Sequence, residues 1–295
     1  MADFLNLIVS GFMNGCIYSM IAVGIVVINK ASGVFNFAQG EFLLVGAYVF
    51  GAFLVQFGLP IWACFFITFV ISALLGMLCE RLTMRPLIGQ PTLSLILMTM
   101  ALGTLLLGLI TLIWGGNWIV FPKMIKTEVI KLGGGIEVSS QLFFGFLASI
   151  VILVVFSLFF RYTKAGLAMR GTSEDHQLAQ SMGISVKNVF TQVWIIAALL
   201  ASISGVILAS LMGAQTLMVT IGLKAFPVVL LGGLESVAGA MIAGPIMGIL
   251  ENLGSAYLDP LTNGEMKEVL PFIIVLIVLL FKPYGLFGLK RIERI

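Results

Sequence analysis

The sequence predicts an all-α fold, a polytopic bundle of transmembrane helices, and three observations support this prediction. First, 60% of its 295 residues are hydrophobic and only 10% are charged, whereas typical globular chains are roughly 45–50% apolar and 25% charged. Second, the mean hydropathy is +1.15. Third, apolar runs near or above the roughly 18–20 residues that cross a bilayer recur along the whole chain, and short segments between them hold nearly all the charge.

Apolar length and turn signals together predict eight membrane spans. They lie at about 5 to 28, 37 to 57, 61 to 80, 93 to 114, 141 to 160, 188 to 212, 238 to 257 and 269 to 281. The first run has no basic segment before it and is followed directly by further spans, so we interpret it as a retained helix rather than a secretory signal. No soluble domain is expected, and a single transmembrane domain is predicted over 1–295. The cysteines fall in or beside apolar runs and are expected to be buried thiols: Cys16, Cys64 and Cys79.

A ninth apolar stretch, Gly222 to Leu234, is short and bounded by glycines. It predicts a broken or re-entrant helix, which is tolerated at membrane depth only where protein or water covers the backbone.

Basic residues indicate which ends of the spans are cytoplasmic. They form three clusters: Arg81 and Arg85; Arg161, Lys164, Arg170 and Lys187; and Lys282, Lys290, Arg291 and Arg294. All three clusters are on the inner side only if the ninth stretch also crosses. The N-terminus is then outside and the C-terminus is cytoplasmic.

Small residues recur at four-residue spacing in the first and seventh spans. They are Gly11, Gly15 and Ser19 in the first, and Ala240, Gly244 and Gly248 in the seventh. Such faces allow helix backbones to approach closely. Sequence leaves two interpretations open, helix packing and a sliding or pore-lining surface.

The longest charged interval of the chain covers about 161–188. It predicts a short surface helix that Thr172 caps and that Gly183 ends in a left-handed conformation. Glu174 and Asp175 would lie in its first turn, where the helix dipole favours acids.

Two interpretations of this segment compete. It is either a solvated connector or a docking helix that receives force from a cytoplasmic motor. On such a helix Ala179 and Met182 would share one face, and the lone histidine, His176, would be solvated or at an interface rather than a ligand.

The chain has no motor of its own, because the phosphate-binding Walker A motif requires a Gly-Lys pair and none occurs in the sequence. An ATP-driven mechanism therefore needs a separate ATPase subunit. We expect no cofactor in this chain, with ATP and Mg bound by that partner.

Three ordered blocks carry a resemblance that runs nearly end to end. They are GVFNFAQGEFLLVGAY at 33–48, LKAFPVVLLGGLESVAGAMIAGPIMGILEN at 223–252 and LLFKPYGLFG at 279–288. With them the chain resembles the LivH-type permeases, the membrane subunits of branched-chain amino acid ABC importers. Gln39 stands where many members carry His, and Glu235 interrupts a run that is often Gly-Leu-Gly-Ser.

The resemblance implies an importer-permease fold and a set of partners. These are a second, LivM-like permease subunit, cytoplasmic ATP-binding subunits, a periplasmic or extracellular solute-binding protein and membrane lipid, with no nucleic acid. It implies a multi-pass protein of the bacterial inner membrane that passes branched-chain amino acids or a similar small solute, such as an amide, urea or another small acid. Residues at the positions that contact the ATPase in such permeases are Arg170, Glu174, Ala179 and Gly183, and we add the neighbouring Asp175.

The substrate pathway is predicted to include residues from two of these blocks: Asn36, Phe37, Gln39, Glu41, Glu235 and Ser236. The first four open the second span, where unpaired helix amides attract an anionic or dipolar group. The alternative is that Asn36 and Gln39 only satisfy the helix end while Glu41 pairs with a cation such as Lys30. The stretch 222–236 would be the pseudo-symmetric counterpart of 33–48.

Other functions are less well supported. An ion-coupled secondary transporter usually needs intramembrane acids, and Glu251 is the main acid deep in a predicted span. An intramembrane enzyme is disfavoured because the chain has no His-Glu-x-x-His and no Gly-x-Ser-x-Gly motif. A passive channel would not explain an ordered cytoplasmic helix.

Overall fold

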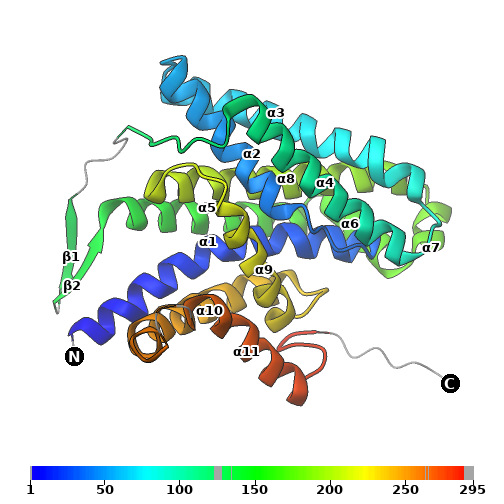
Figure 1. Ribbon diagram of the computed structural model, residues 1–295. Coiled ribbons are helices and arrows are strands. Elements are labelled where there is room, and N and C mark those ends of the chain that lie inside the picture. Colours follow the sequence, from blue (N-terminus) through cyan, green and yellow to red (C-terminus); the bar gives the residue numbers. More distant parts are fainter. Residues whose placement is uncertain (1, 123–127, 134, 263, 265, 289–295) are drawn as a thin grey trace.

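The computed structural model describes residues 2–122, 128–133, 135–262, 264 and 266–288, and these residues are mainly helical (Figure 1). The N-terminal half contains α1 Ala2–Ser32, α2 Gln39–Gly51, α3 Ile61–Cys79, α4 Thr92–Trp114, β1 Val129–Gly133 and β2 Ile136–Ser139. The C-terminal half contains α5 Ser140–Tyr162, α6 Lys164–Glu174, α7 His176–Ser181, α8 Val186–Met212, α9 Met218–Gly232, α10 Val237–Leu258 and α11 Met266–Phe281. Within the described part of the chain, seven helices are long and apolar enough to cross a membrane.

The predicted spans correspond to observed helices. The eighth, at 269 to 281, corresponds to α11, which has 16 residues and is therefore shorter than a usual span. Two helices are extended by π-helical turns, α2 by Ala52–Gln56 and α3 by Glu80–Met84. The all-α prediction holds apart from the antiparallel β1–β2 hairpin, which was not predicted.

Two helices form the centre of the bundle, α1 and α2. In α1, 89% of the most apolar window is buried, whereas the figure for α3 and for α5 is 22%. The inner helices meet closely because glycine faces backbone: a Cβ at Gly205 of α8 would overlap the backbone carbonyl of Leu43 in α2. The outer helices present their apolar side chains outward, as expected of surfaces that face lipid.

The small residues of α1 pack against those of α10. A Cβ at Gly15 would overlap the backbone at Gly244, and one at Gly11 would overlap the backbone at Gly248. Ser19 also donates a hydrogen bond to the carbonyl of Met241 at 3.0 Å. Of the two interpretations of these faces, helix packing is therefore the one observed.

The prediction of a broken or re-entrant helix at 222–234 is wrong in one respect. α9 is short, with 15 residues and hence a length of about 22 Å, but it is continuous through Pro227. Gly222 does not interrupt it, because this glycine lies inside α9 and packs against Gly40 at the start of α2. The helix ends at Gly233, whose φ is +105°.

The bundle has two distinct ends. Figure 1 shows β1 and β2 beside the first turns of α1 at one end, and α6 and α7 at the opposite end. The first contact is direct, since the Asn6 side chain accepts a hydrogen bond from the backbone of Glu137 at 2.8 Å. At the other end, Lys30, Arg161 and Arg170 line one cavity, so basic residues far apart in sequence gather there.

Candidate functional site

The polar segment between α5 and α8 forms two short helices, α6 and α7, instead of the single helix that the sequence predicted. Thr172 lies inside α6, and its buried hydroxyl has no hydrogen-bond partner among the described residues, so its predicted role as a cap is wrong. Glu174 is the last residue of α6 and does not lie in a first turn. The predicted cap was displaced along the chain, because the residue that caps a helix is Asp175, three positions after Thr172.

Asp175 begins α7 by capping it. Its carboxylate accepts hydrogen bonds from the backbone amides of Gln177 at 2.7 Å and Leu178 at 3.0 Å. Gly183 follows the helix with a φ of +83°, as predicted for a left-handed residue after a helix end. The cap and the glycine give this six-residue helix a defined start and end despite its length.

The two sides of α7 differ, and the prediction that Ala179 and Met182 share one face is wrong. Ala179 is buried, whereas Met182 is 82% exposed and Leu178 is 64% exposed. On α6, Leu167 is exposed as well. Leu178 and Met182, four positions apart, thus place two apolar side chains on the exposed side of this polar segment.

Arg170 joins α6 to the end of α5. Its Nη2 donates to the carbonyl of Arg161 at 3.1 Å, and its guanidinium lies over the ring of Phe160, 5.7 Å from the centroid. Of the residues predicted for ATPase coupling, Arg170 and Ala179 therefore face the bundle, while Glu174 and Asp175 are exposed.

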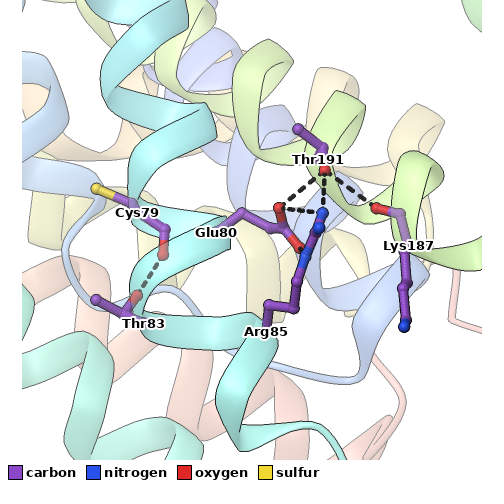
Figure 2. A network of polar contacts seen from close by, with 6 residues as sticks. All are labelled: Cys79, Glu80, Thr83, Arg85, Lys187 and Thr191. Atoms are coloured by element: carbon purple, nitrogen blue, oxygen red, sulfur yellow. Dashed lines mark hydrogen bonds and ion pairs between the residues drawn. The ribbon is translucent and has the colours of Figure 1, made fainter.

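An ion pair between a buried carboxylate and a partly exposed guanidinium lies where α8 begins and was not identified from the sequence (Figure 2). Glu80 is 1% exposed and receives two hydrogen bonds from Arg85, from Nε and Nη2, each at 3.0 Å. The hydroxyl of Thr191 donates to Glu80 at 2.8 Å and accepts from Arg85 at 2.9 Å. The carbonyl of Lys187 lies within 3.1 Å of the same hydroxyl. The network thus ties the end of α3 to the first turns of α8.

A cavity of about 260 Å³ connects this network with α7, since Glu80, Arg85 and His176 all line it. His176 is exposed and packs edge-on against Phe190 of α8, with 5.7 Å between ring centroids. This position agrees with a solvated or interface histidine. The α6–α7 segment and the pair of Glu80 and Arg85 therefore line the same cavity at this end of the bundle.

Asn36 and Gln39 form a closed hydrogen-bond set at the start of α2. Asn36 accepts from the amide of Ala38 at 3.1 Å and donates to Gln39 at 3.0 Å. Gln39 in turn donates to the carbonyl of Ala197 in α8 at 3.2 Å. Both side chains are fully buried. These contacts join the start of α2 to α8, while no side chain of the described residues caps the first amides of α2.

Phe37 and Glu41 have different surroundings. Phe37 stacks on Phe226 of α9, with 4.8 Å between centroids. Glu41 is 9% exposed, and its Oε2 has no hydrogen-bond partner among the described residues. The expected alternative, an ion pair between Glu41 and Lys30, is wrong for the described part of the chain. The Glu41 carboxylate packs instead against Gly103 of α4, where an added Cβ would lie 3.1 Å away.

Glu235 and Ser236 lie in the turn between α9 and α10, away from the start of α2. Ser236 caps α10 by accepting a hydrogen bond from the amide of Gly239 at 3.0 Å. Glu235 lines a cavity with Lys30, Arg161 and Arg170. The six residues predicted for the substrate pathway are thus divided between the start of α2 and the α9–α10 turn.

A second ion pair was also missed. Lys224 of α9 is 5% exposed and contacts Glu251 of α10 and Glu268 of α11, each at 2.8 Å. Glu251 is 2% exposed, and Tyr18 of α1 faces it. Glu251 is therefore neutralised by a lysine instead of standing free in the membrane interior.

Together these features define a class: a multi-pass helical membrane protein, with a compact polar segment at one end and, among the residues described, no group of three or more metal-binding side chains. Residues 7–279 match the family described as "Branched-chain amino acid transport system / permease component", and the chain belongs to this family. It is therefore a transport subunit of an ABC importer and not an enzyme. Membership implies partnership with ATPase and substrate-binding components.

The chain is similar to named relatives over most of its length. It is 29% identical to the "High-affinity branched-chain amino acid transport system permease protein LivH" of Salmonella typhimurium, with 99% of this chain and 98% of the relative covered. It is 31% identical to the "Probable branched-chain amino acid transport permease protein LivH" of Methanocaldococcus jannaschii, with 94% and 90% covered. A more distant similarity, 25% identity with 85% and 74% covered, is to the "Fructose import permease protein FruG" of Bifidobacterium longum.

Proposed function

We propose that this chain pairs with a second, LivM-like permease and, driven by cytoplasmic ATP-binding subunits, imports branched-chain amino acids delivered by a periplasmic or extracellular solute-binding protein. ATP and Mg are bound by the partner ATPase. The named LivH relatives support the solute class. The observation that carries the proposal is the α6–α7 segment, because its capped helices and exposed apolar side chains suit the docking of a protein.

The coupling segment is proposed to cover 161–188. Force applied to α7 would pass to α8 through the short Gly183 turn, and from α8 to the end of α3 through the hydrogen bonds of Thr191 with Glu80 and Arg85. The Glu80 carboxylate is buried, and leaving a buried charge without its partners is costly, so these contacts would hold α8 and the end of α3 together when α7 moves.

We place the α6–α7 end in the cytoplasm, with the N-terminus outside. The basic residues support this orientation, since Lys30, Arg161 and Arg170 gather at that end and cytoplasmic ends are enriched in Lys and Arg. The membrane would be the inner membrane of the cell.

The solute passage is proposed to run past Glu41. An amino acid carries an ammonium group, and the carboxylate of Glu41 has an oxygen without a hydrogen-bond partner among the described residues. Phe37 supplies an adjacent aromatic surface. Asn36 and Gln39 hold the start of α2 in place and Ser236 caps α10, so we assign these three residues to positioning. Glu235, at the same turn as Ser236, lines a cavity.

The ion-coupled alternative is not favoured, because the chain belongs to a family of ABC-importer permeases. Such a transporter usually needs intramembrane acids, and Glu251, the acid that the sequence suggested for this role, is held by Lys224 at 2.8 Å.

The decisive experiment is uptake by the purified complex in liposomes, with the solute-binding protein supplied outside. We expect leucine uptake that requires internal ATP and persists when ion gradients are collapsed. Competition by valine, isoleucine, amides, urea and fructose then defines the solute class. Uptake that does not require internal ATP but stops when the ion gradients are collapsed would overturn the importer proposal.

A second experiment tests the coupling segment. Replacing 174–183 with a Gly/Ser linker should leave a folded, membrane-inserted chain that no longer transports. ATP-dependent uptake at the parental rate would show that this segment is only a connector.

A further inference from the structure

A second cavity at the α6–α7 end has a chemistry that the transport of a solute does not use. It has a volume of about 450 Å³, within the roughly 300–1,000 Å³ of ligand pockets. Three cationic side chains line it, each from a different helix: Lys30 of α1, Arg161 of α5 and Arg170 of α6. The acid in its lining is Glu235. With these four groups ionised, the cavity has a net positive charge.

The backbone adds to this positive potential. Ser236, the capping residue of α10, lines the cavity together with Val237 and Ala238 of the first turn. The first amides of a helix have no partner within the helix, and the helix dipole is positive at this end. α10 has 22 residues, so its dipole is fully developed at the cavity wall. The convergence of three cations and a helix start indicates a site for an anion.

The guanidinium of Arg170 is already fixed in position. Its hydrogen bond to the Arg161 carbonyl and its contact with the Phe160 ring hold it beside the cavity. Arg161 itself lies over the ring of Tyr162, 5.4 Å from the centroid. Less side-chain entropy is lost on binding when the cations are preorganised.

Apart from Ser157, the remaining walls are apolar. Phe160, Met241 and Phe287 line the cavity beside the cations. Phe160 and Met241 belong to α5 and α10, which are candidate membrane spans. If these helices span the membrane as proposed, the cavity would lie where they end, at the level of lipid headgroups. It combines a cationic interior with apolar walls. A free anion would use only the first of these features.

We propose that this cavity binds the phosphate-bearing headgroup of an anionic phospholipid. Basic pockets between spans on the cytoplasmic side are suited to such headgroups. The phosphate would lie between Lys30, Arg161 and the first turn of α10, with the acyl chains leaving along α5. Since Arg170 joins α5 to α6, the bound lipid would also hold α6 against the bundle.

The test measures lipid binding to the purified full-length complex by native mass spectrometry. We expect phosphatidylglycerol to bind in preference to phosphatidylcholine. The double variant Lys30→Gln/Arg161→Gln should weaken that preference roughly 30-fold, because each basic residue near a membrane surface contributes several-fold to anionic lipid binding. The matched control is Arg81→Gln, an exposed base outside this cavity, which should bind like the parent. Parental preference in the double variant would overturn the proposal.

Two further arms keep the result clear. Inorganic phosphate is added as a competitor, and displacement of phosphatidylglycerol by it at equal concentration would show a free-anion site and overturn the lipid assignment. A photoactivatable phosphatidylglycerol is also crosslinked to the parent complex, which needs no variant to fold. Crosslinks at 157–161 and 237–241 support the proposal, and crosslinks confined to other segments refute it.

Discussion

Thr191 of α8 donates a hydrogen bond to the carboxylate of Glu80 at 2.8 Å, although the two residues are 111 positions apart. The same hydroxyl accepts a hydrogen bond from Arg85, so one side chain of α8 contacts both partners of the ion pair at the end of α3 (Figure 2). Because α8 directly follows the α6–α7 segment, this contact links the helix after that segment to the end of α3.

Thr191→Val tests this link, since valine keeps the shape of threonine and removes the hydroxyl. We expect a loss of about 1–3 kcal/mol, the cost of leaving a buried polar partner unsatisfied, seen as a lower thermal midpoint of the purified complex. We also expect less solute transported per ATP hydrolysed. The control is Thr111→Val, an exposed residue whose hydroxyl, within the described part of the chain, bonds to the Leu107 carbonyl of its own helix. Equal effects of the two changes would deny Thr191 a special role.

Two substitutions of Asp175 distinguish the effect of its capping hydrogen bonds from the effect of its negative charge. Asp175→Ala removes both hydrogen bonds to the first amides of α7, which typically costs about 1 kcal/mol. We expect the helix to fray and ATP-driven uptake to fall while membrane insertion is unchanged. Asp175→Asn retains an acceptor that caps nearly as well, so uptake should recover. If the asparagine variant is as impaired as the alanine variant, the charge itself matters and the capping argument is wrong.

Gly205 tests the close contact between α2 and α8. Gly205→Ala would drive a methyl group into the backbone carbonyl of Leu43, and overpacking of this kind costs about 1–3 kcal/mol. We expect a lower yield of monodisperse protein by size-exclusion chromatography. Gly108 of α4 is the matched control because a Cβ there meets no atom within 4 Å. A normal yield for Gly205→Ala would contradict the tight packing of α2 on α8.

The pair of Lys224 and Glu251 tests whether buried charge is structural. Lys224→Met leaves Glu251 buried without its cation, for which a loss of about 3–5 kcal/mol is expected. The double variant Lys224→Met/Glu251→Met removes both charges and should fold again, because apolar residues often replace a buried pair without loss. Thermal midpoints and uptake are measured together. A double variant that folds but does not transport would assign the pair a part in the transport cycle.

The long apolar helices were predictable from sequence, whereas the polar partners were not. The length of an apolar run is enough to locate a span. The small residues of α1 and α10 predict that each helix packs closely against a neighbour, although they do not say which neighbour. Lys224, by contrast, lies in an apolar run, and its partners come 27 and 44 residues later. No local signal connects them, so only the packing of α9 against α10 and α11 reveals the pair.

The sequence correctly predicted a capped helix in the polar segment, but it placed the cap at the wrong residue. Thr172 and Asp175 are both competent caps, and sequence does not say which one begins a helix. The structure selects Asp175 because residues 164–174 already form α6. The β1–β2 hairpin escaped prediction for a different reason. β1, Val-Ile-Lys-Leu-Gly, lacks the alternation of apolar and polar residues that identifies a strand, and β2 alternates over only four residues.

Glu41 is the residue whose substitution best tests the proposed passage. Glu41→Gln keeps the size of the side chain and removes its charge. If the carboxylate receives the ammonium group of the solute, leucine uptake should fall roughly tenfold or more, because a hydrogen bond to a charged group contributes about 1.5–3 kcal/mol. The fold should not suffer, since Oε2 has no hydrogen-bond partner among the described residues. Glu137→Gln, which alters an exposed acid on the hairpin, is the control for loss of one negative charge. Uptake at the parental rate, with a lowered thermal midpoint, would place Glu41 in the structure of the bundle and not in the path of the solute.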